Sequence, residues 1–166
     1  MKLLFSSILL LLSCATYSQA DKATIKLQAQ EIAKATIEAD WETVINYTYP
    51  KITQLMGGKE QMVQFISNSI AQQQIVFESA VIGDPGEIYR TGDTHLFSLV
   101  PQTLVLKTPN AKLKTEGYLL AVSEDRGQRW YFIDTAQLTM ENVQSMLPNY
   151  NMELVIPPKK QAVLLD

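Results

Sequence analysis

Residues Lys112–Ser123 read KLKTEGYLLAVS, a pattern that indicates a β-strand with two apolar faces. Successive side chains of a strand point to opposite faces, so Leu119 and Ala121 share one face. Leu120 and Val122 share the other. A single layer of helices covers only one face of a sheet. We therefore expect the second face to be covered by the C-terminal tail or by a second copy of the chain, and the latter predicts a homodimer packed through the sheet.

The same alternation extends to both sides of this strand. Apolar residues repeat with a period of two over four further ranges, each bounded by residues that favour turns: 75–82, 87–90, 94–107 and 129–134. Within the third range, Pro101 has no backbone N–H to donate, which predicts an edge position or a bulge there. The C-terminal half is therefore expected to be a meander of antiparallel strands.

The N-terminal half has helical periodicity instead. Residues 21–39 contain no Gly or Pro and carry a single apolar stripe, which predicts an amphipathic helix. Asp40 is a natural N-cap for a short second helix that begins at Trp41. Pro50 is expected to interrupt that helix, because proline cannot continue the backbone hydrogen bonding.

A third helix is predicted after the pair Gly57 and Gly58, which favours a helix end. It covers residues 59–73, and four of its apolar side chains are expected to face inward: Met62, Phe65, Ile66 and Ile70. A short last helix is predicted over 139–147. Helices followed by a run of strands are typical of an α+β fold.

The first twenty residues have the three-part layout of a secretory signal. Lys2 supplies a positive charge, Leu3–Leu12 is almost entirely apolar, and Ser18-Gln19-Ala20 offers small residues to a signal peptidase. About ten apolar residues are too few to cross ~30 Å of hydrocarbon, so we expect no transmembrane helix. The sequence predicts an exported chain, periplasmic or secreted, with a signal peptide over 1–20.

Cys14 leaves a second outcome open. Leu11-Leu12-Ser13-Cys14 resembles the lipobox of bacterial lipoproteins, which would leave the chain lipid-anchored at Cys14. Ordinary cleavage after Ala20 would instead remove the single cysteine of the chain, and with it any disulfide or thiol chemistry. In both cases we expect one domain over 21–150, followed by a C-terminal tail over 151–166.

The composition excludes some classes of function. The 166 residues are 46% hydrophobic and 19% charged, with a net charge of -3 and no basic cluster, so nucleic acid is not an expected partner. The chain holds no phosphate-binding loop and no complete catalytic motif. With one histidine and one cysteine, it offers too few ligands for a zinc site, and we expect neither a metal nor a cofactor.

Two stretches carry a resemblance to a known family. Asp40-Trp41-Glu42 opens the second helix, and Asp125–Asp134, which reads DRGQRWYFID, is a turn followed by an aromatic-rich strand. With three N-terminal helices and a meander of strands, they resemble the nuclear transport factor 2-like superfamily, and Tyr47–Gly58 resembles its secreted bacterial members without an assigned activity. The resemblance covers about Asp21–Asp134. It implies a cystatin-like cone: three helices packed in a curved antiparallel sheet, with a pocket at the open end.

Asp134 and His95 are the candidate catalytic residues. Asp134 shares a strand face with Trp130 and Phe132, so an inward orientation would place its carboxylate at the rim of an apolar pocket as a general base. His95 could orient or shuttle a proton. The structural alternatives are a turn or cap residue for Asp134 and a solvated or structural residue for His95. The candidate ligand-binding residues are the tyrosines and aromatic side chains expected at the pocket: Tyr47, Tyr118, Trp130 and Phe132.

Superfamily members include enzymes, binding modules and immunity or assembly factors, so the fold alone does not choose among functions. The favoured hypothesis is an exported, non-enzymatic binding or accessory domain with an apolar pocket for a small molecule. A lyase or isomerase that uses Asp134 and His95 is the first alternative. A partner in envelope assembly or toxin immunity is the second, suggested by the sheet with two apolar faces.

Overall fold

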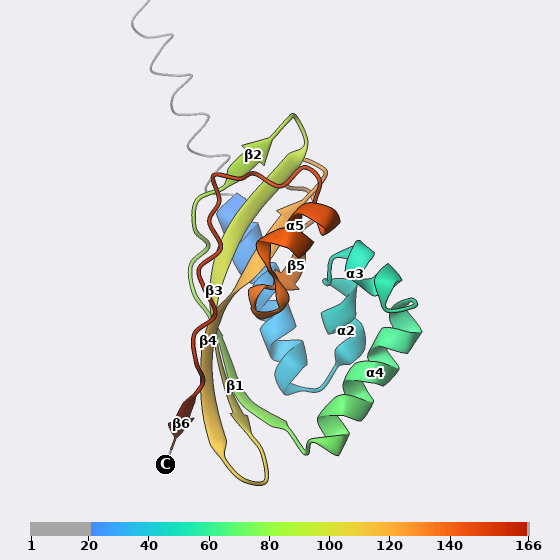
Figure 1. Ribbon diagram of the computed structural model, residues 1–166, viewed down its shortest axis with the longest axis vertical. Coiled ribbons are helices and arrows are strands. Elements are labelled where there is room, and N and C mark those ends of the chain that lie inside the picture. Colours follow the sequence, from blue (N-terminus) through green and yellow to red (C-terminus); the bar gives the residue numbers. More distant parts are fainter. Residues whose placement is uncertain (1–20, 166) are drawn as a thin grey trace, which may run out of the picture.

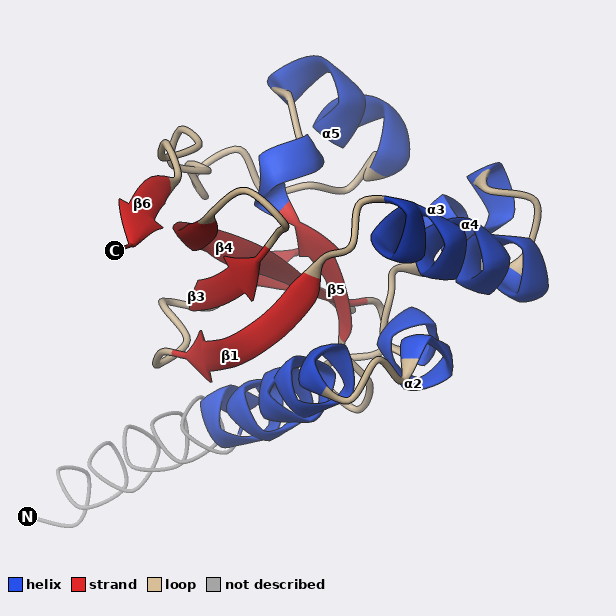
Figure 2. Ribbon diagram, turned by 90° about the horizontal axis from the view of Figure 1, so that it is seen from below, coloured by secondary structure: helices blue, strands red, loops and turns tan. Residues whose placement is uncertain are grey.

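A computed structural model describes residues 21–165 as an α+β fold built on a six-stranded antiparallel sheet (Figures 1 and 2). The signal peptide predicted for residues 1–20, including Cys14, lies outside the described residues. Among residues 21–165, no helix combines the length and the apolar character that a membrane span requires.

The helices follow the predicted order. Residues 21–37 form an N-terminal helix, and four more helices follow it among the described residues: α2 (Trp41–Asn46), α3 (Pro50–Leu55), α4 (Lys59–Gln72) and α5 (Met140–Met146). Asp40 caps α2, since its carboxylate accepts from the Thr43 N–H at 3.1 Å and from the Thr43 hydroxyl at 2.6 Å. Pro50 begins α3 at the first helical position, where its missing N–H costs no hydrogen bond.

The strands are a long antiparallel pair with shorter partners on both sides. They are β1 (Val76–Ile82), β2 (Tyr89–Thr91), β3 (His95–Lys107), β4 (Lys112–Ser123), β5 (Tyr131–Asp134) and β6 (Val163–Leu165). The order across the sheet is β1-β3-β4-β5, with β2 also beside β3 and β6 also beside β4. β5 begins later than the predicted 129, because the Arg129 N–H donates to the Asp125 carboxylate within the turn.

Pro101 lies where β3 lacks a strand partner on one side. β1 pairs with β3 up to Ile82 opposite Gln102, and β2 pairs with β3 from Tyr89 opposite Phe97. Between them a loop crosses this side of β3, and the Pro101 carbonyl accepts from the Gly83 N–H at 2.8 Å. The predicted edge position is therefore confirmed locally, although β3 is an interior strand.

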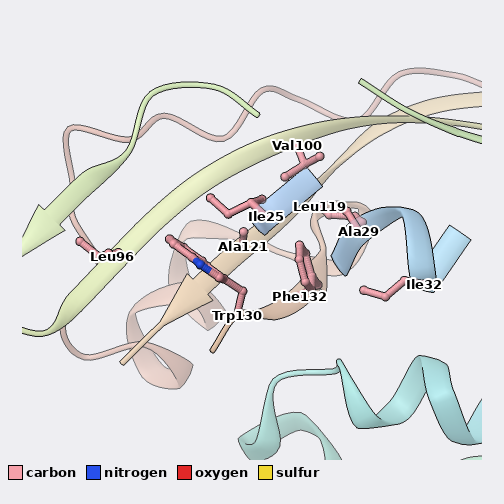
Figure 3. Packing of buried hydrophobic residues seen from close by; sticks show 9 residues of the cluster. All are labelled: Ile25, Ala29, Ile32, Leu96, Val100, Leu119, Ala121, Trp130 and Phe132. Carbon is pink, nitrogen blue, oxygen red and sulfur yellow. The ribbon is translucent and has the colours of Figure 1, made fainter. Parts of the chain in front are cut away.

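Around Leu119–Val122, both faces of the sheet are covered by other parts of the chain, as Figure 2 shows for the layers. The helix face, which carries Leu119 and Ala121, packs on the N-terminal helix through Ile25, Ala29 and Ile32 (Figure 3). The tail face, which carries Leu120 and Val122, packs on α5 and the C-terminal tail through three buried residues: Val143, Tyr150 and Leu154. The tail thus supplies the second layer that the sequence requires, and the argument for a homodimer through the sheet loses its basis.

One predicted orientation is wrong. The sequence placed Phe65 on the inward face of the third helix, yet this side chain is 59% exposed and α4 contains no buried residue. The reason is that α4 lies outside α2 and α3, on which it packs (Figure 1), whereas the N-terminal helix occupies the helix face of the sheet.

Candidate functional site

A hollow of about 210 Å³ lies between the helices and the helix face of the sheet. We call it the inner hollow. Its lining comes from the N-terminal helix, α2 and its C-terminal end, and the four strands β1, β3, β4 and β5: Ile32, Ala33, Thr36, Val44, Tyr47, Thr48, Phe77, Ile82, Gln102, Leu104, Leu119, Phe132 and Asp134. Most of these side chains are apolar, as is usual for the binding pockets of small molecules.

A second hollow of about 190 Å³, the outer hollow, adjoins the inner one at the edge of the sheet. The two share Gln102, Leu104 and Asp134 among their lining residues. The outer wall is the C-terminal tail between Pro157 and Ala162. This hollow lies along β4 where β5 has ended and β6 has not yet begun to pair, so the edge of β4 is open there.

Gly117 lies on this open part of β4. A Cβ added at Gly117 would meet no other atom within 4 Å, so the missing side chain leaves free space beside the strand. Gly117 pairs with Gln102 of β3 and lies in register with the helix-face residue Leu119. The absence of a side chain at this position therefore contributes to the outer hollow.

Asp134 lies between the two hollows, at the last position of β5. Its Oδ1 accepts from the Ala136 N–H at 2.8 Å and caps the short 3₁₀ helix η1 (Thr135–Gln137). The cap expected as an alternative for Asp134 is confirmed. The carboxylate is also exposed at the mouth of an apolar hollow, next to the buried Phe132, as the inward orientation of its strand face predicted.

His95 is not part of this site. It begins β3 and shares the tail face with Phe97, whereas Asp134 shares the helix face with Phe132. The register separates them further, since Asp134 pairs with Leu119, which lies opposite Val100 and not opposite His95. The ring of His95 contacts the Thr94 hydroxyl and the Asn149 amide at 3.1 Å each. The structure therefore does not bring the two candidate catalytic residues together.

Tyr47 and Phe132 do form a common wall of the inner hollow. Their ring centroids lie 6.4 Å apart at an interplanar angle of 68°, an edge-to-face contact. The Tyr47 hydroxyl donates to the Glu31 carboxylate, a hydrogen bond that raises the pKa of Tyr47 above its usual value. The hydroxyl of this candidate ligand-binding residue is thus already bonded to Glu31.

Tyr118 and Trp130, the other two candidate ligand-binding residues, differ in whether a ligand can reach them. Tyr118 lines the outer hollow, and its backbone carbonyl accepts from the Thr135 hydroxyl at 2.9 Å. Trp130 is fully buried among Ile25 and Leu96 (Figure 3), and its indole N–H has no partner among the described residues. A ligand could reach Trp130 only by opening the core, so its predicted ligand-binding role does not fit this position.

Sequence reasoning missed one of the two polar residues that line both hollows. Gln102 lines both of them, and no hydrogen bond occupies its side chain in the described part of the chain. The alternation of β3 carries the signal, because Gln102 lies two residues from Val100 and from Leu104 and therefore shares their strand face. A glutamine within an otherwise apolar strand face is a candidate for specific recognition, since its amide both donates and accepts.

The inner hollow offers mainly apolar surface, with the carboxylate of Asp134 as its charged group. In the part of the chain that the structure describes, no three His, Cys, Asp or Glu side chains gather closely enough to hold a metal ion. Comparison with known proteins adds no analogy: no family model, no curated protein and no solved structure matches this chain.

Proposed function

We propose that the chain is an exported, non-enzymatic binding or accessory domain that holds a small, mainly apolar molecule in the inner hollow. The observation that carries this proposal is the composition of the lining, in which apolar side chains from the N-terminal helix, α2 and four strands converge on one space.

The polar residues at the mouth suggest the chemistry of the ligand. Asp134 offers a carboxylate that accepts hydrogen bonds, and Gln102 offers an amide that both donates and accepts them. A ligand with an apolar ring and one hydroxyl or amine would lay the ring against Phe132 and Leu119 and direct the donor to Asp134. A hollow of about 210 Å³ is smaller than the ~300–1,000 Å³ of drug-sized pockets, which favours molecules of one or two rings.

The fold and the compartment are parts of the same proposal. Helices followed by an antiparallel meander, with a hollow between them, support membership of the nuclear transport factor 2-like superfamily and its cone. The apolar run of residues 3–12 and the small residues Ser18 and Ala20 support export by a cleaved signal. A lipid anchor at Cys14 is the alternative form of export.

The first alternative, a lyase or isomerase that uses Asp134 with His95, gains no support from a geometry that places them on opposite faces of the sheet. The second alternative, an assembly or immunity partner, was suggested by the two apolar faces of the sheet. It loses support because the N-terminal helix packs on one face and α5 with the tail packs on the other.

The test of the binding proposal is the affinity for 4-ethylphenol, measured by isothermal titration calorimetry. Ala33 lines the inner hollow and is 7% exposed, so Ala33→Leu fills part of that space. Ala23→Leu makes the same change at an exposed position of the same helix and serves as the control. We expect binding to weaken by about tenfold or more in Ala33→Leu and to stay unchanged in Ala23→Leu. Equal affinity in the two variants would refute the proposal.

A further inference from the structure

A third hollow, of about 280 Å³, lies between α3, the beginning of α4 and the beginning of β5. We call it the basic hollow. It shares only Thr48 with the lining of the inner hollow and is not part of the site proposed above. Its lining combines two cationic side chains, Lys59 and Arg129, with polar and apolar neighbours from α2 and α3.

The two cations are held close together by Asn46. The Lys59 ammonium donates to the Asn46 side-chain oxygen at 2.7 Å, and the Arg129 guanidinium donates to the Asn46 backbone carbonyl at 3.4 Å. The guanidinium also lies 5.1 Å from the ring centroid of Tyr131. An ammonium has three N–H donors and a guanidinium five, so both cations keep donors for a ligand.

The two cations give the basic hollow a positive charge. Within the described part of the chain, neither Lys59 nor Arg129 forms an ion pair, and no Asp or Glu lines the basic hollow. Lys59 also borders a neighbouring hollow between α2 and α4, where Glu42 and Glu60 are present. Arg129 likewise borders a further hollow whose lining includes Glu31. In the basic hollow, by contrast, both cations line the same space, and the described residues place no carboxylate in its lining.

Two further features favour an anion at this place. The N-cap of the fourteen-residue helix α4 is Gly58, which has no side chain to cap the first N–H groups, and a helix N-terminus carries a partial positive charge. Thr53 also lines the hollow, and although it is only 6% exposed, its hydroxyl has no hydrogen-bond partner among the described residues. A buried hydroxyl without a partner is uncommon in folded proteins.

We propose that the basic hollow binds an oxyanion, a carboxylate or phosphate group that Lys59 and Arg129 engage with charge-assisted hydrogen bonds. Pro50 and the ring of Tyr131 line the same hollow and would contact the apolar part of a small organic acid or phosphate ester. The basic hollow and the inner hollow are tested by different ligands and different variants, so the failure of one proposal leaves the other standing.

The test is the binding of inorganic phosphate and of acetate by the processed chain, each titrated calorimetrically at constant ionic strength adjusted with sodium chloride. We expect at least one of the two oxyanions to bind. Its affinity should fall by about tenfold in Lys59→Gln and in Arg129→Gln, the size expected for the loss of a hydrogen bond to a charged group. Preference for phosphate or for acetate identifies which oxyanion the site takes.

Two controls separate a site from a general effect of charge. Arg126→Gln removes a cation from the same β4–β5 turn, and Lys34→Gln removes one from the N-terminal helix, and neither residue lines the basic hollow. Wild-type affinity in both controls supports the proposal. It is overturned if neither oxyanion binds more than chloride does, if binding survives in both site variants, or if it falls equally in the controls.

A measurement on the wild-type chain does not depend on how the variants fold. Bound oxyanion should shift the amide signals of residues 59–61 at the beginning of α4, because their N–H groups have no partners within the helix. Shifts confined to other parts of the chain at saturation would contradict the proposed location.

Discussion

Thr48 and Phe132 form a parallel β-bridge at the free edge of β5. The Phe132 N–H donates to the Tyr47 carbonyl at 2.7 Å, and the Phe132 carbonyl accepts from the Tyr49 N–H at 3.2 Å. Tyr47, the C-cap of α2, packs against the core of the helix face, whereas Tyr49 belongs to the core of the tail face. This bridge fixes one wall of the inner hollow and anchors the core of the tail face at the same point.

Phe132→Ala tests the packing around that bridge. Phe132 is 4% exposed, so the substitution leaves a cavity, and we expect it to lower the free energy of unfolding by about 3–5 kcal/mol. Phe65→Ala is the control, because Phe65 is 59% exposed on α4 and should cost less than about 0.5 kcal/mol. Urea denaturation measures both, and a larger loss for Phe65→Ala would show that α4 packs more deeply than described.

The cover of the tail face is tested by two neighbouring residues. Leu154 is 2% exposed and Val155 is 76% exposed. We expect Leu154→Ala to lower the free energy of unfolding by about 2–5 kcal/mol, and Val155→Ala to change it by less than about 0.5 kcal/mol. Similar small effects of the two substitutions in thermal or urea unfolding would mean that the tail does not cover the sheet in solution.

Thr53→Val tests the state of the basic hollow without its ligand. The Thr53 hydroxyl is buried and has no hydrogen-bond partner among the described residues, and valine has the same shape without the polar group. In buffer without oxyanions we expect the free energy of unfolding to rise by about 1 kcal/mol. A decrease would show that the hydroxyl is hydrogen-bonded in the free protein.

The attachment of the tail near β6 predicts a pH dependence. Glu116 accepts from Lys114 at 2.6 Å and from Lys160 at 3.0 Å, and these bonds lower the pKa of Glu116 from 4.5 to about 2. Because the pKa is lower in the folded chain, the stabilisation is complete above the unfolded value of 4.5 and is lost as the pH falls towards 2.

Nuclear magnetic resonance titration of the Glu116 carboxyl carbon measures this pKa directly. Lys160→Gln should raise it towards the usual value, because one of the two bonded cations is lost. Lys159→Gln, at the neighbouring exposed lysine, should leave it unchanged. An unperturbed midpoint near 4.5 in the wild-type chain would mean that the ion pairs do not persist in solution.

The alternation of Lys112–Ser123 predicted a strand with two buried faces, and the structure has both of them. The sequence left open whether the tail or a second copy covers the second face, because periodicity shows that a face is apolar but not what packs on it. The predicted inward orientation of Phe65 is wrong for a related reason. Its helical spacing matches an inward stripe, but the N-terminal helix fills the sheet face and leaves α4 outside.

The candidate site was predictable within strands but not between them. The alternation along β5 correctly predicted that Asp134 shares a face with Phe132. The alternation along β3 correctly predicted that His95 shares a face with Phe97. Relating the two strands requires the register through β4, which sets the two groups on opposite faces and is not encoded in either strand alone. The alternation of β3 indicates which face carries Gln102, but its place between two hollows depends on the pairing of β3 with β4 and could not be predicted.

The most direct test of the binding account is to map 4-ethylphenol by amide chemical shifts on an isotopically labelled chain that begins at Asp21. We expect saturating ligand to shift the signals of residues around the inner hollow, with Ala33, Leu119 and Phe132 among the largest changes. The account is contradicted if saturating ligand shifts no signal, or if the shifts gather on α4 and the tail while those three residues stay unmoved.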